Sequence, residues 1–596
     1  MALVRIFQQG CGGGGGGGVT QICAGTGIAI SPVGGTGIVT ICSTASGGGV
    51  EVLGSGTCST YRCCVGNVSL GVASAALGGC KNCSRGNCSA IVGGFCNCLQ
   101  SSNSFIGGGT LNCSLGACAT IGGGNNNQSY CAQATIGGGS FNIVFGQNSS
   151  ILGGSTSSIY AGAGCSSIVG GDSNCICTNA GLSFIGGGRV NQIKCSESFI
   201  GGGCDNIVCG RTSNIVGGTK NLINVADCSN IVGGLCNNVQ GALSSVVGGA
   251  CNTASGYCQA IVGGLCNNLS STSNQAFIGG GTCNSTILTS NNSVVVGGCT
   301  NSVYDACLSS VVGGGNNQIQ SSNSAIIGGG SGNFSGTSAQ GFIGAGCDNL
   351  LNISCNAAIV SGAKNCISQG RCSSIVGGIC NHITCVLSSV VGGQQNCVAT
   401  QASSIVGGVC NCIVGGSATS ILGGRINTIC CGNYALIGGG QSHLICGEYS
   451  TILNGCNNCN TSTHSTINGG FLNKTCGCAE VHILGSNICA DTICTSYVNC
   501  LSIKNVPTCC NAPSATDQIL IRNTTCGIVE FAPFCAFGGG GGGVEVLGAG
   551  TCSTYRCCVA NQADADYSAS LGGCFNVICA TSCRSIIGGG DKNAIT

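Results

Sequence analysis

The sequence is poor in charged, proline and aromatic residues. Only 6% of its 596 residues are charged, four are proline, tryptophan is absent, and the formal net charge is +1. A globular enzyme usually carries about a quarter charged residues. No basic patch and no run of like charge is available for nucleic acid. We therefore expect neither a nucleic-acid partner nor an ordinary globular enzyme.

Long apolar runs are also missing, although the mean hydropathy is +0.42. No stretch reaches the roughly 20 uninterrupted apolar residues of a membrane helix. The opening nine residues, Met1 to Gln9, are too short and polar for a signal peptide. These features predict no insertion into a membrane.

Residues for catalysis are scarce. The four histidines are His382, His443, His464 and His482, and the 16 acidic residues are scattered, so no acid–base pair is evident. No Gly-Lys-Ser/Thr follows the glycines, which excludes a phosphate-binding loop. His443 stands where other repeats carry Asn, which favours a structural role. We predict that the protein is not an enzyme and holds no cofactor.

Glycine is abundant, with 112 residues, and much of it belongs to one repeat. The stretch Ser229–Val239 carries two branched residues, Gly-Gly, a short gap and Asn, and it returns at Ser244–Asn252 and Ala260–Asn268. From Gly78 to Gly485 the Gly-Gly anchor, or a lapse such as Ser361, recurs every 15–16 residues, 27 times. Such a short, regular period is typical of a solenoid with one repeat per turn.

The turns should be β rather than α. Segments such as Ser-Ser-Ile-Val are too short for helices, and Gly-Gly would break one, whereas branched residues between turns suit short strands. We predict an all-β, elongated β-solenoid of 15–16 residues per turn, with two strands and two bends in each. With a rise of about 4.8 Å per turn, 27 turns make a rod about 130 Å long.

Asparagine follows Gly-Gly in most repeats and is expected at a corner. Asn tolerates a left-handed bend and bonds its own backbone, and stacked amides can bond from turn to turn. A glycan or ligand contact is the weaker alternative. The corner Asn ladder comprises Asn97, Asn112, Asn142, Asn174, Asn191, Asn206, Asn221, Asn237, Asn252, Asn267, Asn365, Asn381, Asn411 and Asn427.

Each turn offers only two or three inward apolar side chains, which is a thin core. Three coils around one axis would bury the branched residues of all three chains, so we expect a parallel homotrimer. The chain is its own partner in this interpretation, with end-to-end fibres as an extension.

Other segments flank the repeats. We expect an N-terminal segment with a poly-Gly joint at 1–18, a small β module at 19–49, a Cys-rich block start at 50–76, the solenoid at 77–490, a β connector at 491–537, a second poly-Gly joint at 538–543 and a second solenoid block at 544–596. The glycine runs are interpreted as flexible joints, with packed collagen-like helices as the alternative.

The block start is duplicated. Val50–Val65 returns almost unchanged as Val544–Val559, and each copy follows a glycine run. Because the second block has few turns, we expect the chain to be part of a longer one.

Cysteine is unusually frequent, with 57 residues. Successive turns are close enough for disulfides, and the vicinal pairs Cys63-Cys64 and Cys557-Cys558 suit links between chains. Small buried residues at a permissive position are an equally supported interpretation. Zinc at Cys80/Cys83 or Cys456/Cys459 is less favoured, because a structural site needs two such pairs together. One phase forms a predicted column: Cys96, Cys236, Cys251, Cys266, Cys380 and Cys410.

The Ile-Val-Gly-Gly coils resemble the left-handed β-roll of trimeric autotransporter adhesin (YadA-like) heads and coil repeats of phage and large-virus tail fibres. The segment Ala24–Ile28 resembles modules near the start of such fibres, and Tyr497–Val506 and Asp517–Phe531 resemble their connectors. The resemblance implies a trimeric shaft or head on a virion surface or extracellular appendage.

Three functions follow as hypotheses. The first is a structural fibre or shaft. The second is an adhesin whose coil surface binds a host receptor or glycan by avidity. An ice-binding solenoid is less favoured, because the corner positions vary instead of repeating Thr.

Overall fold

Each turn of the chain contains two strands of two or three residues. The computed structural model describes residues 66–499 without a break, together with short strands within 28–62 and 518–595. All of these elements are β, and the described residues contain no helix. The repeats form a parallel β-solenoid, with about 29 turns among the described residues. The predicted all-β solenoid is therefore confirmed, with slightly more turns than the glycine anchors indicated.

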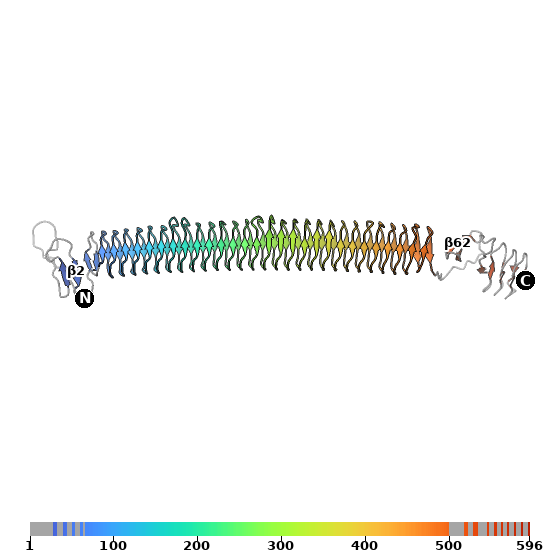
Figure 1. Cartoon of the computed structure of the whole chain (residues 1–596), viewed down its shortest axis with the longest axis horizontal. Helices are drawn as coiled ribbons and strands as arrows, with labels where there is room; N and C mark the ends of the chain where they lie inside the picture. The colour runs from blue at the N-terminus through green and yellow to red at the C-terminus, as the bar shows by residue number, and fades with distance from the viewer. Residues whose placement is uncertain are drawn as a thin grey trace. The chain divides into compact units, whose positions relative to one another are not determined.

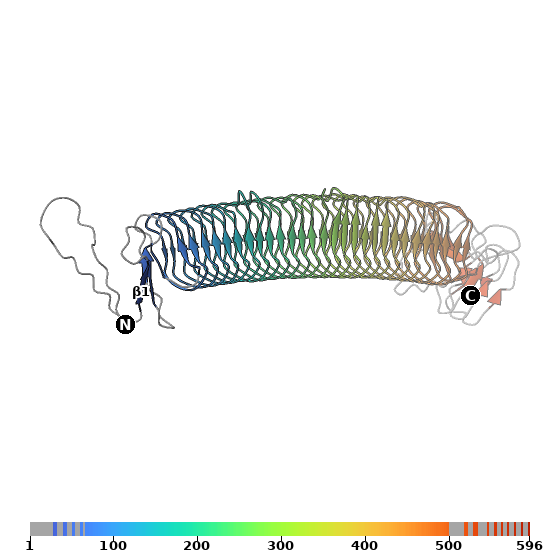
Figure 2. The same ribbon diagram turned by 60° about the vertical axis from the view of Figure 1, so that its left-hand side comes forward.

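The chain divides into two units, Met1–Tyr434 and Ala435–Thr596, and each is described by itself. In the first unit, even-numbered strands from β6 (Ala75–Ala76) to β50 (Ser420–Ile421) form one parallel ladder. Odd-numbered strands from β5 (Val68–Ser69) to β51 (Thr428–Ile429) form the other. We call these the even sheet and the odd sheet. Figure 1 shows their turns stacked side by side, and Figure 2 shows the arrows of one ladder pointing the same way.

The second unit repeats this construction. Its even strands run from β52 (Leu436–Ile437) to β60 (Ser496–Val498), and its odd strands from β53 (Leu444–Ile445) to β59 (Cys489–Ala490). Beyond them lies an antiparallel pair, β61 (Gln518–Arg522) with β62 (Val529–Pro533).

The hairpins at the two block starts have the same register. In the first, β3 (Glu51–Leu53) pairs antiparallel with β4 (Thr60–Arg62), Glu51 opposite Arg62. In the second, β63 (Glu545–Leu547) pairs with β64 (Thr554–Arg556), Glu545 opposite Arg556. An antiparallel pair, β1 (Ile28–Ser31) with β2 (Thr40–Ser43), precedes the first. Both poly-Gly segments lie outside the described residues.

The turn has one more β segment than expected. Between the even and odd strands, a single residue forms a parallel bridge to the next turn, as in Thr219 to Leu235 to Ala250. Two strands and two bends were predicted, so that prediction is incomplete. The bridging residue is polar or small in most turns, and a pattern search based on apolar pairs does not detect it.

The core is one residue deep on each sheet. The second residue of each strand points inward and is fully buried, as in Ile231 of β26 (Asn230–Ile231) and Val239 of β27 (Asn238–Val239). Each inward Ile, Leu or Val contributes about 1.5–3 kcal/mol by burial, whereas some odd strands have an inward polar residue instead, such as Ser114 and Ser129. The outward residue of most strands stays half-exposed, so each sheet presents an open outer face.

The predicted asparagines form a buried ladder. Their side chains are fully buried, and each turn repeats one set of bonds. Asn237 Oδ1 accepts the backbone N–H of Asn252 at 3.0 Å, and Asn237 Nδ2 donates to the carbonyls of Gly233 and Gly249 at 2.9 and 3.1 Å. The ladder thus satisfies backbone groups that the short strands leave unpaired.

One detail of the asparagine prediction is wrong. The left-handed residue is not Asn but the residue before it, for example Cys236 at φ 55°. The second glycine of the pair is the constrained one, because Gly234 has φ 95° and a Cβ there would lie 2.5 Å from Asn237 Nδ2. The first glycine, Gly233, faces open space.

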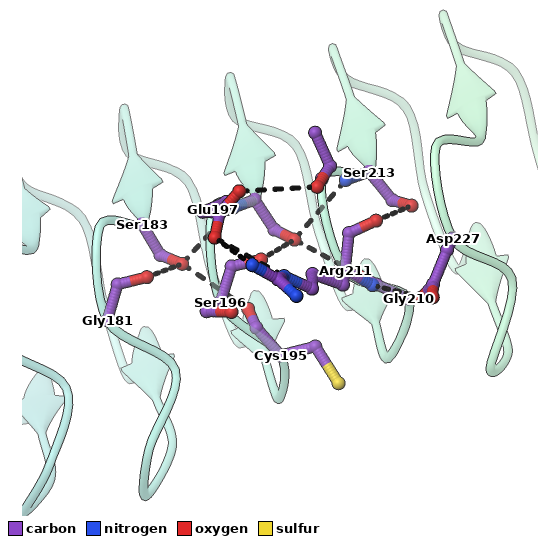
Figure 3. A network of polar contacts seen from close by, with 11 residues as sticks. Gly181, Ser183, Cys195, Ser196, Glu197, Gly210, Arg211, Ser213 and Asp227 are labelled. Atoms are coloured by element: carbon purple, nitrogen blue, oxygen red, sulfur yellow. Dashed lines mark hydrogen bonds and ion pairs between the residues drawn. The ribbon is translucent and has the colours of Figure 1, made fainter.

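A second ladder at the opposite corner was missed from the sequence. Ser244 donates its backbone N–H to Ser229 Oγ at 3.2 Å, and Ser244 Oγ donates to the carbonyl of Gly256 at 2.8 Å. Figure 3 shows this ladder at Ser183 and Ser213. Ala replaces Ser at this corner in several turns, for example Ala119, Ala134 and Ala276, so this corner tolerates the loss of the hydroxyl. Ser is common in every part of this sequence, which hides the ladder.

Charged contacts contribute little. Among residues 66–499 the structure has one salt bridge, Arg211 Nη2 to Glu197 Oε1 at 2.6 Å, between adjacent turns (Figure 3). Both side chains are exposed, and such pairs contribute about 0–1 kcal/mol. Backbone ladders and inward apolar residues therefore hold the coil together.

Candidate assembly face and cysteine columns

The outer face of the even sheet carries no charge in the first unit. Its side chains are the outward residue of each even strand and the residue two positions later. From β8 (Ala90–Ile91) to β50, neither position holds Asp, Glu, Lys or Arg. We call this surface the even face. It exposes a ridge of half-exposed branched side chains: Val92, Leu152, Val169, Val216, Val232, Val247, Val262, Val296, Val312, Val360, Val376, Val391, Val406 and Leu422.

The two positions of the even face are coupled in size. From β8 to β50, every outward Ser, Ala or Asn is followed two residues later by Val or Leu, and every outward Phe by Gly. The ring of Phe199 lies over Gly201, where a Cβ would be 3.3 Å from its Cε1. The rings of Phe184 and Phe199 stack with centroids 5.4 Å apart. In these turns one bulky apolar group is kept and only its position changes.

The outer face of the odd sheet, the odd face, has no such rule. Its outward positions hold Cys, Gln, Ile, Ser, Leu, Asn, Thr, Phe and His, and Arg85 and Lys194 follow two of its strands. Tyr130, Phe145 and Tyr160 stack along it, with centroids 4.2 and 6.3 Å apart. Side chains on this face change from turn to turn.

Three cysteines are in register on the odd face. Cys83 of β7 (Cys83–Ser84) pairs with Cys98 of β9 (Cys98–Leu99), which pairs with Cys113 of β11 (Cys113–Ser114). All three are half-exposed free thiols. A hydrogen bond from Cys113, supported by Gln100 and Arg85, lowers the pKa of Cys98 to about 6. Arg85 Nε donates to Cys83 Sγ at 3.3 Å. We call these residues the thiol column.

The cysteines predicted to form a column lie at the left-handed corner before Asn. Cys96, Cys236, Cys251, Cys266, Cys380 and Cys410 all have φ between 55 and 57°. Cys236, Cys251 and Cys266 occupy successive turns, and Cys283 continues the series. Desolvation, together with the neighbouring thiols Cys251 and Cys283, raises the pKa of Cys266. The other three predicted members stand apart from this series.

Most described cysteines are free thiols. Among the described cysteines, 39 are free, and two, Cys430 and Cys446, are each in a disulfide. Cys63, Cys64, Cys557 and Cys558, predicted to link chains, lie outside the described residues. Neither Cys80/Cys83 nor Cys456/Cys459 has a third potential ligand within 4.8 Å among the described residues.

The histidines occupy separate places. His443 is buried at an Asn-ladder corner, where its Nδ1 accepts the backbone N–H of Asn458 at 3.2 Å. Burial lowers the pKa of His443. His382 lies on the odd face, 3.2 Å from Ser368 Oγ, and His464 stacks on Tyr449.

Comparisons with known proteins assign no family. No protein-family model matches the chain, and no curated protein matches it. Within the described residues, no helix is long and apolar enough to cross a membrane. A functional proposal must therefore rest on the surfaces of the coil.

Proposed function

We propose that the protein is a structural shaft of a virion or an extracellular appendage, built as a parallel homotrimer with the even faces turned inward. The size coupling between Phe/Gly and small/Val positions is the observation that carries this proposal. A surface in contact only with water has no reason to keep one bulky apolar group in most turns, as this face does outside the turns of Thr120, Thr135 and Val294. A surface packed against a neighbour does, because a gap or an overlap there costs stability.

The extent of the even face suits a stable interface. A strip about 10 Å wide over roughly 20 turns, with a rise of about 4.8 Å per turn, covers on the order of 1,000 Å² on each chain. In a trimer each chain divides this area between two neighbours, so each pairwise contact buries on the order of 1,000 Å² in total, which reaches the size expected of a biological interface. The strip combines the branched ridge and the Phe rings with outward Ser, Thr and Asn, a mixture of apolar and neutral polar groups that is also found in protein interfaces.

A second copy of this chain is the best-matched partner. The side chains of the ridge are spaced by one turn of the coil, which is the distance between neighbouring strands of a parallel sheet. A partner that contacts the ridge along its whole length therefore needs side chains with the same spacing. A parallel copy in register supplies that repeat without further adjustment. Rotational symmetry then places the same turn of each chain at the same height.

The odd face supports a second candidate, an adhesin. The stacked rings of Tyr130, Phe145 and Tyr160 are large half-exposed side chains on the face left outward by the proposed assembly. Variable outward residues on a regular scaffold suit recognition of a host receptor or glycan, strengthened by three copies. Loss of cell binding in the Y130S/F145S/Y160S variant would support this role, whereas unchanged binding would remove it.

The assembly proposal is tested by the mass of the purified full chain in solution. One chain has a mass of 57.9 kDa, and light scattering coupled to size exclusion should give three times that value. The measurement is made with reductant present, so that disulfides between chains do not contribute. A single-chain mass at micromolar concentration would contradict the proposal.

A further inference from the structure

The thiol column has a spacing set by the backbone. Cys83, Cys98 and Cys113 are direct partners in three adjacent parallel strands, so their Cα atoms are separated by about 4.8 Å per turn. The neighbouring thiols of Cys113 and Cys83 both act on the Cys98 thiol, as expected for side chains on adjacent strands of one column. Cys83 and Cys113 lie two turns apart and do not reach each other.

We propose that this column binds soft monovalent cations of the Cu(I) class, two ions to three thiolates, each ion bridging neighbouring turns. The site is independent of the proposed function, since it lies on the odd face. None of the comparisons assigns it.

The spacing selects the coordination geometry. Metal–thiolate bonds are about 2.3 Å long, so two bonds in a line span ~4.6 Å, close to the rise of one turn. Linear two-coordinate binding between neighbouring turns therefore needs little movement of the backbone, and the bend required at the shared Cys98 sulfur comes from tilting the Cys83 and Cys113 side chains toward it. A tetrahedral zinc site needs four ligands around one point, whereas this column offers three in a row. Soft thiolate ligands also favour Cu(I).

Charge is balanced at the site. Two monovalent cations and three thiolates give a net charge of −1, and binding releases one proton from each of these thiols that was protonated beforehand, without any change in oxidation state. Arg85 is the cation beside the column, with its Nε 3.3 Å from Cys83 Sγ. Gln100 Nε2 donates to Cys98 Sγ at 3.8 Å. Both donors lie two residues after a column cysteine, so they accompany the thiolates without blocking the space between them.

Two cysteines outside the column serve as internal controls. Cys118 and Cys165 are exposed free thiols at a corner, and the corresponding corners of adjacent turns hold Asn103, Gln133, Asn148 and Leu182. They have the same chemistry but no thiol one turn away.

The test is alkylation of the reduced full chain under anaerobic conditions, with and without Cu(I) supplied as its bicinchoninate complex. Peptide mass spectrometry gives the rate at each cysteine. Because the free thiolate is the nucleophile, a bound cation should slow alkylation of Cys83, Cys98 and Cys113 by about tenfold or more. Cys118 and Cys165 should be unaffected.

Two variants locate the site. Cys98→Ser removes the middle ligand and should return Cys83 and Cys113 to their metal-free rates, while the in-register pair Cys397 and Cys412 stays protected. Gln128 is the next partner of Cys113, so Gln128→Cys should extend protection to residue 128. Equal protection of single cysteines, no protection of the column, or protection that survives Cys98→Ser would each overturn the proposal.

Discussion

The even and odd faces belong to the same coil but follow different rules. Both sheets have short strands, one inward residue per strand and a parallel register. The even face of the first unit excludes charge and exchanges Phe/Gly for small/Val pairs, whereas the odd face admits Cys, Gln, His, Lys and Arg. Both sheets use the same backbone geometry, so the backbone alone does not explain why their outer faces differ. We attribute the even face to contact with other copies.

The largest expected effect comes from charge on the even face. The triple substitution Val232→Asp, Val247→Asp and Val262→Asp places three carboxylates on the ridge. Each lost Val contact costs about 1 kcal/mol, and desolvation of the carboxylates adds to it. We expect association to weaken at least about 100-fold, measured by sedimentation of the full chain.

The control places the same charges on the odd face of the same turns, as Gln240→Asp, Ser255→Asp and Ser270→Asp. Repulsion along the column is then similar, and the mass in solution should stay that of the parent assembly. If both triple variants dissociate equally, the two faces do not differ in function.

A smaller effect is expected when the stability losses at the Asn corner and the Ser corner are compared. Asn237→Ala removes the acceptor of the Asn252 N–H and two donors to glycine carbonyls, which should cost about 2–4 kcal/mol because buried backbone groups lose partners. Ser244→Ala should cost only ~1 kcal/mol, as Ala already occupies this corner in other turns. Hydrogen exchange of residues 229–260 measures both, and equal losses would contradict the assignment.

The size coupling on the even face can be tested directly. In Gly201→Val the new Cβ would clash with the carbonyl oxygen of Val216 and lie 3.3 Å from Cε1 of Phe199, and we expect a loss of at least about 1–3 kcal/mol from overpacking. Adding Phe199→Ser should recover part of it, since small/Val is the pair used in other turns. Denaturant unfolding of the single and double variants gives the coupling energy. Strictly additive losses would show that the two positions are independent.

The smallest expected effect is on the pH dependence of stability, and it comes from His443 at an Asn-ladder corner. Burial lowers the pKa of His443 in the folded chain, so the folded state favours its neutral form. The associated stability is present above the ordinary histidine pKa of about 6.5 and is lost as the pH falls below it. His443→Asn should reduce the loss of stability between pH 7.5 and 5, measured by urea unfolding at both values. An unchanged pH dependence would show that His443 is not its source.

The sequence was sufficient for the fold because its period is the period of the coil. Gly-Gly, Ile and Asn recur at fixed phase, so the sequence alone predicts Asn237 and Asn252 at one corner. The left-handed position was assigned one residue too late, since Cys236 carries no residue-type signal for positive φ. The Ser244 corner was missed because Ser is common throughout the chain.

The candidate surfaces were harder to predict. The coupling of Phe199 with Gly201 becomes informative only when both are known to lie on one outer face. The predicted cysteine column was defined by the residue before Asn, whereas Cys83, Cys98 and Cys113 occupy a strand position that is Gln or Ser in other turns. Recognising them requires the register of the odd sheet.

An electron cryomicroscopy reconstruction of the purified full-length assembly tests the central claim most directly. The account predicts three parallel coils in register, with Val232, Val247 and Val262 of each chain facing the common axis and Tyr130, Phe145 and Tyr160 facing solvent. Single coils, or an assembly joined through the odd faces, would contradict it.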